Sequence, residues 1–237
     1  MQYRRRYVLD NLINCRDLGG YPCEDGSVTR FGRFLRAGMP RPLSEKDLRF
    51  LEEYGVKAVL DLRGNKEAEL YPAFKNCETN IRYRHVSLLE INPATMDLHR
   101  PLIEAYRETL DYYGQAVAES LRFILESGTP FLFHCFIGKD RTGMLAAIIL
   151  HMAGVDDEDI VADYEISYSY LENFFRHERE IGSGLVWDCD EHQRRSDREN
   201  MLAFLDYING KFGSIEGYLR SVGITEGELE GLSCLLK

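Results

Sequence analysis

The sequence predicts an α/β fold in which a central, mostly parallel sheet is flanked by helices, with extra helices at the C-terminus. Two observations predict this fold. The apolar runs Ala58–Leu62 and Phe131–His134 are continuous rather than alternating, which is typical of strands covered on both faces of a sheet. Strand-like runs also alternate along the chain with longer segments of helical periodicity. The 237 residues contain no Pro/Ser-rich linker and no internal repeat, so we expect one domain spanning 1–237.

Four strands are expected between Gly32 and His134. They are Gly32–Arg36, Ala58–Leu62, Tyr83–Leu88 and Phe131–His134. The first and third alternate between apolar and polar residues, whereas the second and fourth are short apolar runs. The continuous runs suit the buried centre of a parallel sheet.

The first helices are predicted from their caps and breaks. Ser44 opens a capping pattern, and the helix that follows it ends near Gly55. A long helical stretch runs from about Pro101 to Glu126, with a break near Gly114. The apolar segment Met144–Met152 predicts a further helix directly after the fourth strand.

The C-terminal part of the chain is also predicted to be helical. Asp156 caps a helix that contains Tyr164, Tyr168 and Tyr170. Their helical spacing favours packing in the core over lining a lid or stacking on a substrate ring. Two capping-box patterns, Ser196–Glu199 and Thr225–Glu228, open the last helices.

The segment Pro130–Gly143 carries the strongest functional signal. Cys135 ends an apolar run, Arg141 follows six residues later, and Gly138 lies in the loop between them. A strand, a tight loop and a helix N-terminus form an anion cradle, because backbone N–H groups and the helix dipole converge there. A thiol in that field loses its proton readily, and an arginine fork matches two phosphate oxygens. The pattern predicts a site that removes phosphate from a substrate.

Cys189 and Arg195 repeat the same spacing in different surroundings. The segment between them has no glycine, places two carboxylates beside the sulfur and follows no apolar strand. Because those charges would repel phosphate, we interpret this segment as a solvated loop. The alternative interpretation of Cys135, a small buried hydrophobic residue at a strand end, explains neither Arg141 nor Gly138.

The loop His134–Gly143 resembles that of the cysteine-dependent phosphatases, and its Gly-Lys-Asp-Arg-Thr-Gly part is similar to the bacterial branch that acts on phosphotyrosine and phosphoinositides. Other segments are similar to that branch in matching order: Asn14–Tyr21, Phe34–Gly38, Leu60–Arg63 with Glu67, and Tyr218–Leu219 with Gly223. The resemblance implies a single phosphatase domain over 1–237 with a phosphatase-like fold. Ile137 stands where the family usually has alanine, which bears on substrate preference more than on mechanism.

Phosphoryl transfer assigns a role to each part of the loop. Cys135 attacks phosphorus and forms a phosphocysteine. The Arg141 guanidinium and the backbone N–H groups hold the equatorial oxygens; these groups belong to Phe136, Ile137, Gly138, Lys139, Asp140 and Arg141. Thr142 donates its hydroxyl to the sulfur, and His134 orients the loop by hydrogen bonds to the backbone. Lys139 raises the local potential, and the resemblance implies that it reaches a second phosphate or an acidic neighbour.

The proton donor to the leaving oxygen stays open between three carboxylates. Many relatives supply it from a Trp-Pro-Asp tripeptide, which this sequence lacks. Asp140, inside the loop, is the first candidate for general acid and later general base, unless it only orients a neighbouring cation. Asp61, at the end of a strand, is the second candidate, and its alternative is a structural pair with Arg63 or Arg16. Asp188, beside the only tryptophan, is the third.

Three classes of function fit the loop. The first is a phosphomonoester hydrolase acting on phosphotyrosine, with dual specificity or phosphoinositides as wider substrate classes. The second is a rhodanese-like sulfurtransferase, whose loop cysteine does not need an arginine six residues on. The third is a catalytically silent phosphate-binding module, which typically has lost the cysteine or the arginine. The intact pair of Cys135 and Arg141 favours the first class.

Composition narrows the partners. A net charge of −10 argues against nucleic acid, because phosphate backbones bind basic faces. The six cysteines form no Cys-x-x-Cys pair, so neither a metal site nor a disulfide framework is indicated, and no cofactor is expected. The run Arg4-Arg5-Arg6 permits at most peripheral membrane contact. The N-terminus lacks the apolar core of a signal peptide. We therefore expect a cytoplasmic protein whose partners are a phosphorylated protein or phosphoinositide and inorganic phosphate.

Overall fold

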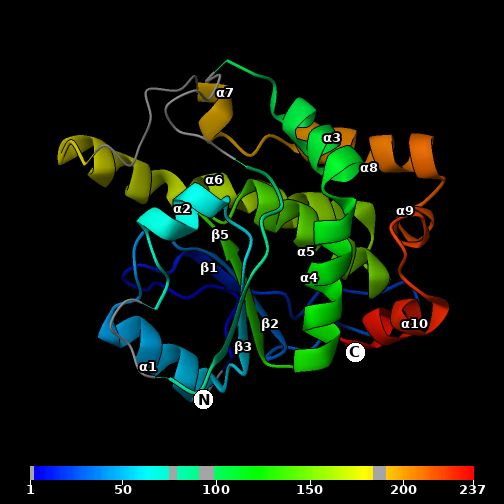
Figure 1. The fold of residues 1–237 in the computed structure, drawn as a ribbon, viewed down its shortest axis with the longest axis horizontal. Coiled ribbons are helices and arrows are strands. Elements are labelled where there is room, and N and C mark those ends of the chain that lie inside the picture. The colour runs from blue at the N-terminus through cyan, green and yellow to red at the C-terminus, as the bar shows by residue number, and fades with distance from the viewer. Residues whose placement is uncertain (1–2, 75–78, 91–98, 184–190) are drawn as a thin grey trace.

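The computed structural model describes residues 3–74, 79–90, 99–183 and 191–237. Within them lies a five-stranded sheet of order β1-β2-β5-β3-β4 (Figure 1). The strands are β1 (Ile13–Asp17), β2 (Phe34–Gly38), β3 (Ala58–Asp61), β4 (Arg82–His85) and β5 (Phe131–Cys135). β1 pairs antiparallel with β2, and the other neighbouring strands are parallel. The expected mostly parallel sheet is therefore confirmed.

All four expected strands are present, with some ends shifted. β3 and β5 agree with the prediction to within one residue, because their continuous apolar runs mark them clearly. β2 begins two residues later than the expected Gly32. β4 ends at His85 rather than Leu88, since it is an edge strand with exposed residues and a weak pattern.

The sequence pattern does not predict β1, because its pairing is irregular. The register with β2 shifts between Ile13 and Arg16, and Asn14 has a positive φ of 52°. A short strand with such an irregularity shows no clean alternation of apolar and polar residues. β1 nevertheless matters for function, since it carries Asn14 and Arg16 to the end of the sheet where the loop after β5 begins.

Helices cover both faces of the sheet (Figure 1). They are α1 (Glu45–Tyr54), α2 (Asn65–Leu70), α3 (Leu102–Tyr112), α4 (Gly114–Ser127), α5 (Asp140–Met152), α6 (Asp157–Glu180), α7 (Glu191–Arg194), α8 (Arg198–Phe212), α9 (Ile215–Ser221) and α10 (Glu226–Cys234). α1 lies on one side of the sheet, and α4, α5 and the C-terminal helices lie on the other. The extra C-terminal helices of the prediction are therefore confirmed.

Alternation along the strands divides the apolar residues between two cores. On β5, Phe131 and Phe133 join the larger core with α4, α5 and the C-terminal helices, whereas Leu132 joins the smaller core under α1. β2 does the same, with Phe34 on one side and Leu35 on the other. Successive side chains of a strand point to opposite faces, so a continuous apolar run is what a sheet covered on both faces requires.

Most predicted helix ends match the structure. Ser44 and Asp47 form a capping box at α1, and Gly55 closes that helix in the left-handed conformation. The expected break near Gly114 is the junction between α3 and α4, at Tyr113. Thr225 and Glu228 form the second expected capping box at α10. Local hydrogen bonds of this kind are readable from sequence because both partners lie within one helical turn.

The predicted capping box at Ser196 is wrong. The N-cap of α8 is Asp197, and the Ser196 hydroxyl instead donates to the carbonyl oxygen of Glu165 at 2.7 Å and accepts from the Tyr168 N–H at 2.8 Å. A tertiary partner on α6 therefore replaces the local one. The tyrosines of α6 divide in a similar way: Tyr164 is fully buried as expected, while Tyr168 is only partly covered.

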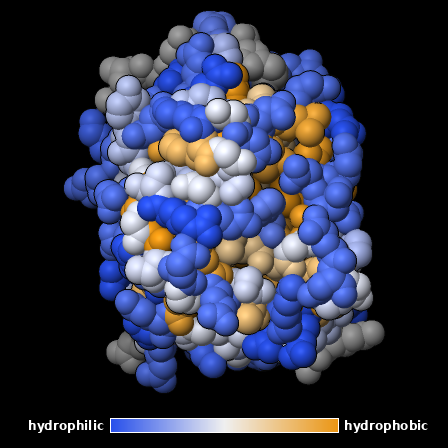
Figure 2. Space-filling model, turned by 90° about the vertical axis from the view of Figure 1, so that its right-hand side faces the viewer, coloured by the Kyte–Doolittle hydropathy of each residue, from blue (hydrophilic) through white to orange (hydrophobic). Residues whose placement is uncertain are grey.

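The side of the molecule that carries the C-terminal helices shows apolar patches interrupted by hydrophilic side chains (Figure 2). A scattered distribution of this kind is normal for a folded chain with a single main core. Among the described residues, no helix combines the length and the apolar character that a membrane crossing needs.

Candidate active site

The loop between β5 and α5 packs backbone against backbone on the end of β2. Gly138 has a positive φ of 70°, and a Cβ placed there would lie 2.4 Å from the carbonyl carbon of Ala37. A Cβ at Gly38, on β2, would lie 2.3 Å from the carbonyl carbon of Ile137. Both positions therefore require glycine, which explains why a glycine stands in the middle of this loop.

Two side chains from other strands turn the loop carbonyls outward. The Asn14 amide donates to the carbonyl oxygens of Ile137 and Gly138, at 3.3 and 3.0 Å. The Arg36 guanidinium donates to those of Gly138 and Lys139, at 2.9 and 3.3 Å. Because the N–H and C=O of a trans peptide point in opposite directions, these contacts leave the N–H groups on the inner side of the loop. The loop is thereby preorganised to bind an anion.

A buried cluster of charge lies beneath the loop. Asp163 on α6 forms ion pairs with both Arg16 and Arg36, the first at 2.9 Å. Burial opposes ionisation of Asp163, but the two guanidinium charges hold the pKa of its carboxyl below the ordinary value. Burial lowers the pKa of Arg36 to about 10, so that it stays charged at neutral pH. Two cations share one anion here, which leaves a net positive charge under the phosphate-binding loop.

Glu67 fixes the arginine of the loop. The Arg141 guanidinium donates from two nitrogens to the two carboxylate oxygens of Glu67, and the contact from Nη2 to Oε1 is 3.0 Å. Glu67 also accepts from the Gly64 N–H at 2.8 Å, which anchors it at the start of α2. Burial opposes the charge of Arg141, but Glu67 raises the pKa of this guanidinium further above its ordinary value. Arg141 therefore enters the site charged and oriented.

Cys135, the candidate nucleophile, and its neighbours are buried. Cys135 is 2% exposed, and its backbone carbonyl oxygen accepts a hydrogen bond from the Met39 N–H at 3.0 Å. The hydroxyl of Thr142 is buried and has no hydrogen-bond partner among the described residues, and its donation to the sulfur stays a prediction. His134 Nδ1 lies 3.1 Å from the Cys135 carbonyl oxygen, which fits an orienting role. Burial lowers the pKa of His134 to about 4, and the imidazole is neutral at neutral pH.

Lys139 does not point its ammonium group at the centre of the loop. Its Nζ donates to the backbone carbonyl oxygens of Gln193 and Arg195, at 2.5 and 2.8 Å, and the side chain is fully buried. These contacts hold the ammonium group at the end of α7, and the expected reach toward a second phosphate stays a prediction. The acidic neighbour that was also expected is present, since the Oδ1 atom of Asp140 lies 3.5 Å from Nζ.

The structure separates the carboxylates that the sequence left open. Asp140 is the first residue of α5, lies inside the loop and keeps 28% of its side chain exposed. Asp61 is fully buried, with an ion pair of 2.6 Å to Arg63 and a hydrogen bond of 2.8 Å from the Tyr83 hydroxyl. Burial opposes its ionisation, yet the neighbouring His134 and the Arg63 guanidinium hold the pKa of Asp61 below the ordinary value. These contacts favour the structural pair for Asp61. Asp188, like Cys189, lies outside the described residues.

Several residues of the site are assigned only by the fold. Asp163 is one of them, because nothing in the α6 sequence marks it as the partner of two arginines. Glu67 and Arg36 belong to segments that resemble a phosphatase branch, but their contacts with the loop could not be derived from spacing. Tyr106 on α3, which donates to Asp140, is another. The described residues contain no group of three His, Cys, Asp or Glu side chains that could hold a metal ion.

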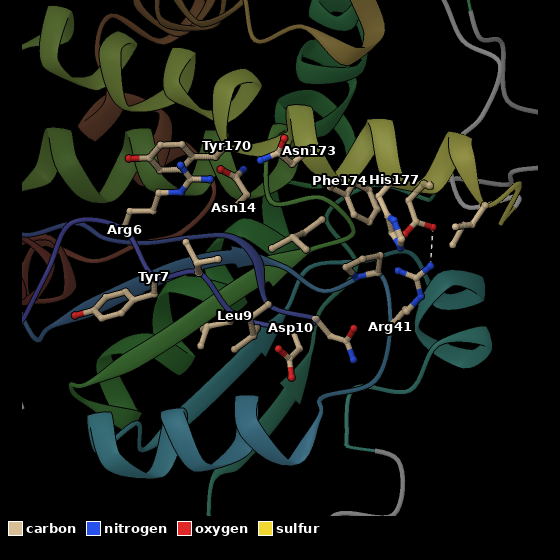
Figure 3. A pocket seen from close by; sticks show the side chains of 17 residues that line it. Arg6, Tyr7, Leu9, Asp10, Asn14, Arg41, Tyr170, Asn173, Phe174 and His177 are labelled. Carbon is tan, nitrogen blue, oxygen red and sulfur yellow. Dashed lines mark hydrogen bonds and ion pairs between the residues drawn. The ribbon is translucent and has the colours of Figure 1, made fainter.

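A hollow lies beside the loop (Figure 3). The N-terminal segment and the C-terminal half of α6 line this pocket, whose volume is about 560 Å³. Asn14 lies in its wall, and an ion pair of 2.6 Å between Arg41 and Glu178 crosses one end. Cys135 is not among the lining residues, so the pocket is distinct from the position of the candidate nucleophile.

Comparison with known proteins agrees with the geometry of the loop. The chain is 29% identical to a tyrosine-protein phosphatase of Nostoc commune over 218 residues, which cover 86% of this chain and 74% of that protein. It is 34% identical to a Cupriavidus necator protein whose name assigns it to the tyrosine-protein phosphatases, covering 93% and 85%. It is 32% identical to the triple specificity protein phosphatase PtpB of Mycobacterium tuberculosis, covering 96% and 98%. The family model described as the tyrosine phosphatase family matches residues 7–236. The chain therefore belongs to the tyrosine phosphatase family.

Proposed function

We propose that this enzyme hydrolyses phosphotyrosine in proteins through a phosphocysteine formed at Cys135. The observation that carries the proposal is the loop itself, whose carbonyls are held outward by Asn14 and Arg36 while Arg141 is oriented by Glu67. Such a loop offers N–H groups and a guanidinium to three equatorial phosphate oxygens, with the Cys135 sulfur in line with the leaving oxygen.

Two chemical steps follow from this arrangement. In the first, the Cys135 thiolate attacks phosphorus, the bond to the tyrosine oxygen breaks, and Asp140 protonates that oxygen. In the second, Asp140 takes a proton from water, the water attacks the phosphocysteine, and inorganic phosphate leaves. Thr142 supports the second step, because its unpartnered hydroxyl can donate to the departing sulfur. The ion pairs of Asp163 with Arg16 and Arg36 leave a net positive charge beneath the loop, which favours binding of the phosphate dianion.

Phosphotyrosine is the preferred substrate class in this proposal, with phosphoinositides as the second candidate. One relative is named as a phosphatase of triple specificity, which supports a wider range for this chain. The contacts of Lys139 argue for a single phosphate, because its ammonium group is already bonded to two backbone carbonyl oxygens. Since the thiol of Cys135 must stay reduced, a reducing compartment such as the cytoplasm suits the enzyme.

A turnover panel tests the proposal. Phosphotyrosine peptide, phosphoserine peptide and phosphoinositide would be compared at equal concentration by release of inorganic phosphate. We expect the highest kcat/KM for the phosphotyrosine peptide. A higher value for a phosphoinositide would reverse the order of the two candidates. Release of no phosphate from any of them would favour the silent phosphate-binding module.

A further inference from the structure

Tyr106 links α3 to the phosphate-binding loop. Its ring is buried among core residues, with an edge-to-face contact to Phe204 at a centroid distance of 6.2 Å. Its hydroxyl donates to the Oδ1 atom of Asp140 at 2.6 Å and lies 2.7 Å from the hydroxyl of Tyr164. Three polar groups from α3, α5 and α6 thus form one chain of hydrogen bonds that ends on the carboxylate proposed as the proton donor.

The direction of this chain is fixed by its chemistry. Burial raises the pKa of Tyr106 and of Tyr164 well above the ordinary value, so both phenols keep their protons at neutral pH. An ionised carboxylate can only accept, and therefore the single proton of Tyr106 is directed at Asp140. The oxygen of Tyr106 is then left to accept from the Tyr164 hydroxyl.

The loop sequence accommodates the second tyrosine. A Cβ at Gly143 would lie 3.0 Å from the Cδ2 atom of Tyr164, so the last glycine of the loop segment leaves room for this ring. Lys139 lies on the same side of the carboxylate as Tyr106, because its Nζ atom is 3.5 Å from Oδ1 of Asp140. Both contacts described for the Asp140 carboxylate, one with Tyr106 and one with Lys139, are made to Oδ1.

We propose that Tyr106 is a positioning residue for proton transfer, which occupies Oδ1 of Asp140 so that Oδ2 carries the proton to the leaving oxygen and takes it back from water. The arrangement serves both steps, because Oδ1 accepts from Tyr106 whether or not Oδ2 is protonated. Without the hydroxyl, the carboxyl group rotates, and the proton is less often on the oxygen that faces the substrate. This inference rests on the proposed role of Asp140.

Leaving-group dependence tests the inference, because a stable nitrophenolate departs without help whereas an unsubstituted phenolate needs a proton. Tyr106→Phe should lower kcat/KM for phenyl phosphate about tenfold and change the value for nitrophenyl phosphate less than about twofold. Inhibition by inorganic phosphate should stay the same, which shows that the loop is intact. Tyr207→Phe is the matched control, since its hydroxyl also donates to a carboxylate, Asp111, but at an exposed site.

Combination with Asp140→Asn separates the possible failures. In that background Tyr106→Phe should add no further leaving-group dependence, because the group that it positions is gone. Either of two results would overturn the role of Tyr106 alone. One is an equal loss of kcat/KM for both substrates in Tyr106→Phe. The other is a further loss in the double variant that is confined to phenyl phosphate. If Asp140→Asn does not increase the leaving-group dependence above that of the wild type, the assignment of the proton donor is overturned, and the inference with it. Tyr164→Phe should give a smaller effect of the same kind, since it removes only the outer hydrogen bond.

Discussion

Arg141 and Glu67 form a two-point ion pair that holds the arginine of the proposed phosphate-binding loop in one orientation. The two residues are far apart in sequence, and α2 brings the carboxylate to the loop. A guanidinium that is already held in one orientation loses less side-chain entropy when it binds phosphate. The pair also explains why a buried cation is tolerated at this site before substrate binds.

Glu67→Gln should weaken catalysis without unfolding the protein. The amide keeps the shape and one acceptor but removes the charge that orients Arg141. We expect kcat/KM for an aryl phosphate to fall about tenfold and inhibition by vanadate to weaken by a similar factor. Glu69→Gln, an exposed substitution on the same helix, should leave both values unchanged. Equal behaviour of the two variants would show that the ion pair has no part in phosphate binding.

Cys135→Ser should separate chemistry from binding. The hydroxyl is a poor nucleophile, so turnover of an aryl phosphate should fall by about a thousandfold or more, while phosphate still binds to the N–H groups of the loop. Cys234→Ser is the control, because that thiol is free and exposed. Calorimetric titration with phosphate and a turnover assay measure the two properties. Retained activity in Cys135→Ser contradicts the assignment of the nucleophile.

Gly138→Ala should destroy the loop, and Gly128→Ala provides a matched comparison. Both glycines have a positive φ, 70° and 64°, so alanine is strained at either site, and the extended ψ of −168° at Gly128 makes that strain about 1–3 kcal/mol there. A Cβ at Gly138 would also meet the backbone of Ala37 at 2.4 Å, whereas one at Gly128 would meet nothing within 4 Å. We expect phosphate binding to be lost only in Gly138→Ala, as measured by titration. Similar losses in the two variants would mean that strain rather than close packing accounts for the effect.

Asp61→Asn should affect stability rather than proton transfer. The substitution leaves the buried Arg63 guanidinium without its carboxylate, which typically costs about 3–5 kcal/mol of unfolding free energy. The ratio of kcat/KM between nitrophenyl and phenyl phosphate should stay at the wild-type value, in contrast to Asp140→Asn. Urea unfolding and the two substrates measure these properties. A changed ratio in Asp61→Asn, with none in Asp140→Asn, would exchange the roles of the two carboxylates.

His134 should make the protein less stable in mild acid. The folded protein holds the pKa of this imidazole at about 4, while the unfolded chain binds the proton near 6.5. The unfolded state therefore takes up more protons between these values, and the free energy of unfolding falls as the pH drops through this window. Between pH 7 and pH 5 the loss should be about 2 kcal/mol, as measured by urea unfolding. His134→Asn should remove this dependence, whereas the exposed His177→Asn should keep it.

Features that depend on local sequence were largely predictable. The two continuous apolar strands, the capping boxes at Ser44 and Thr225, and the break before Gly114 all involve residues close together along the chain. The positions of Cys135 and Arg141 in one loop belong to the same class, because a strand, a loop and a helix in succession determine where both residues lie.

The failures of prediction have a common cause in long-range contacts. Ser196 has the sequence of a helix cap, but α6 offers its hydroxyl two partners that a local pattern cannot reveal. The contacts of the Lys139 ammonium group with the carbonyl oxygens of Gln193 and Arg195 are likewise long-range, and nothing in the local sequence indicates them. The sequence pattern does not predict β1, because its pairing is irregular around Asn14 and its apolar and polar residues do not alternate.

The sequence by itself determined the fold class, and it predicted the loop His134–Gly143 with Cys135 as its candidate nucleophile and Arg141 as its candidate arginine, because hydrophobic periodicity and short-range spacing indicate each of them. Only the tertiary structure decided which groups support that loop. Asp163, Glu67 and Tyr106 reach it from α6, α2 and α3, and their roles depend on distances that chain order does not encode. The same holds for the carboxylates, since Asp61 became a buried partner of Arg63 while Asp140 stayed at the loop. Burial and pairing set the charge and position of such groups, and both arise only when distant segments pack together.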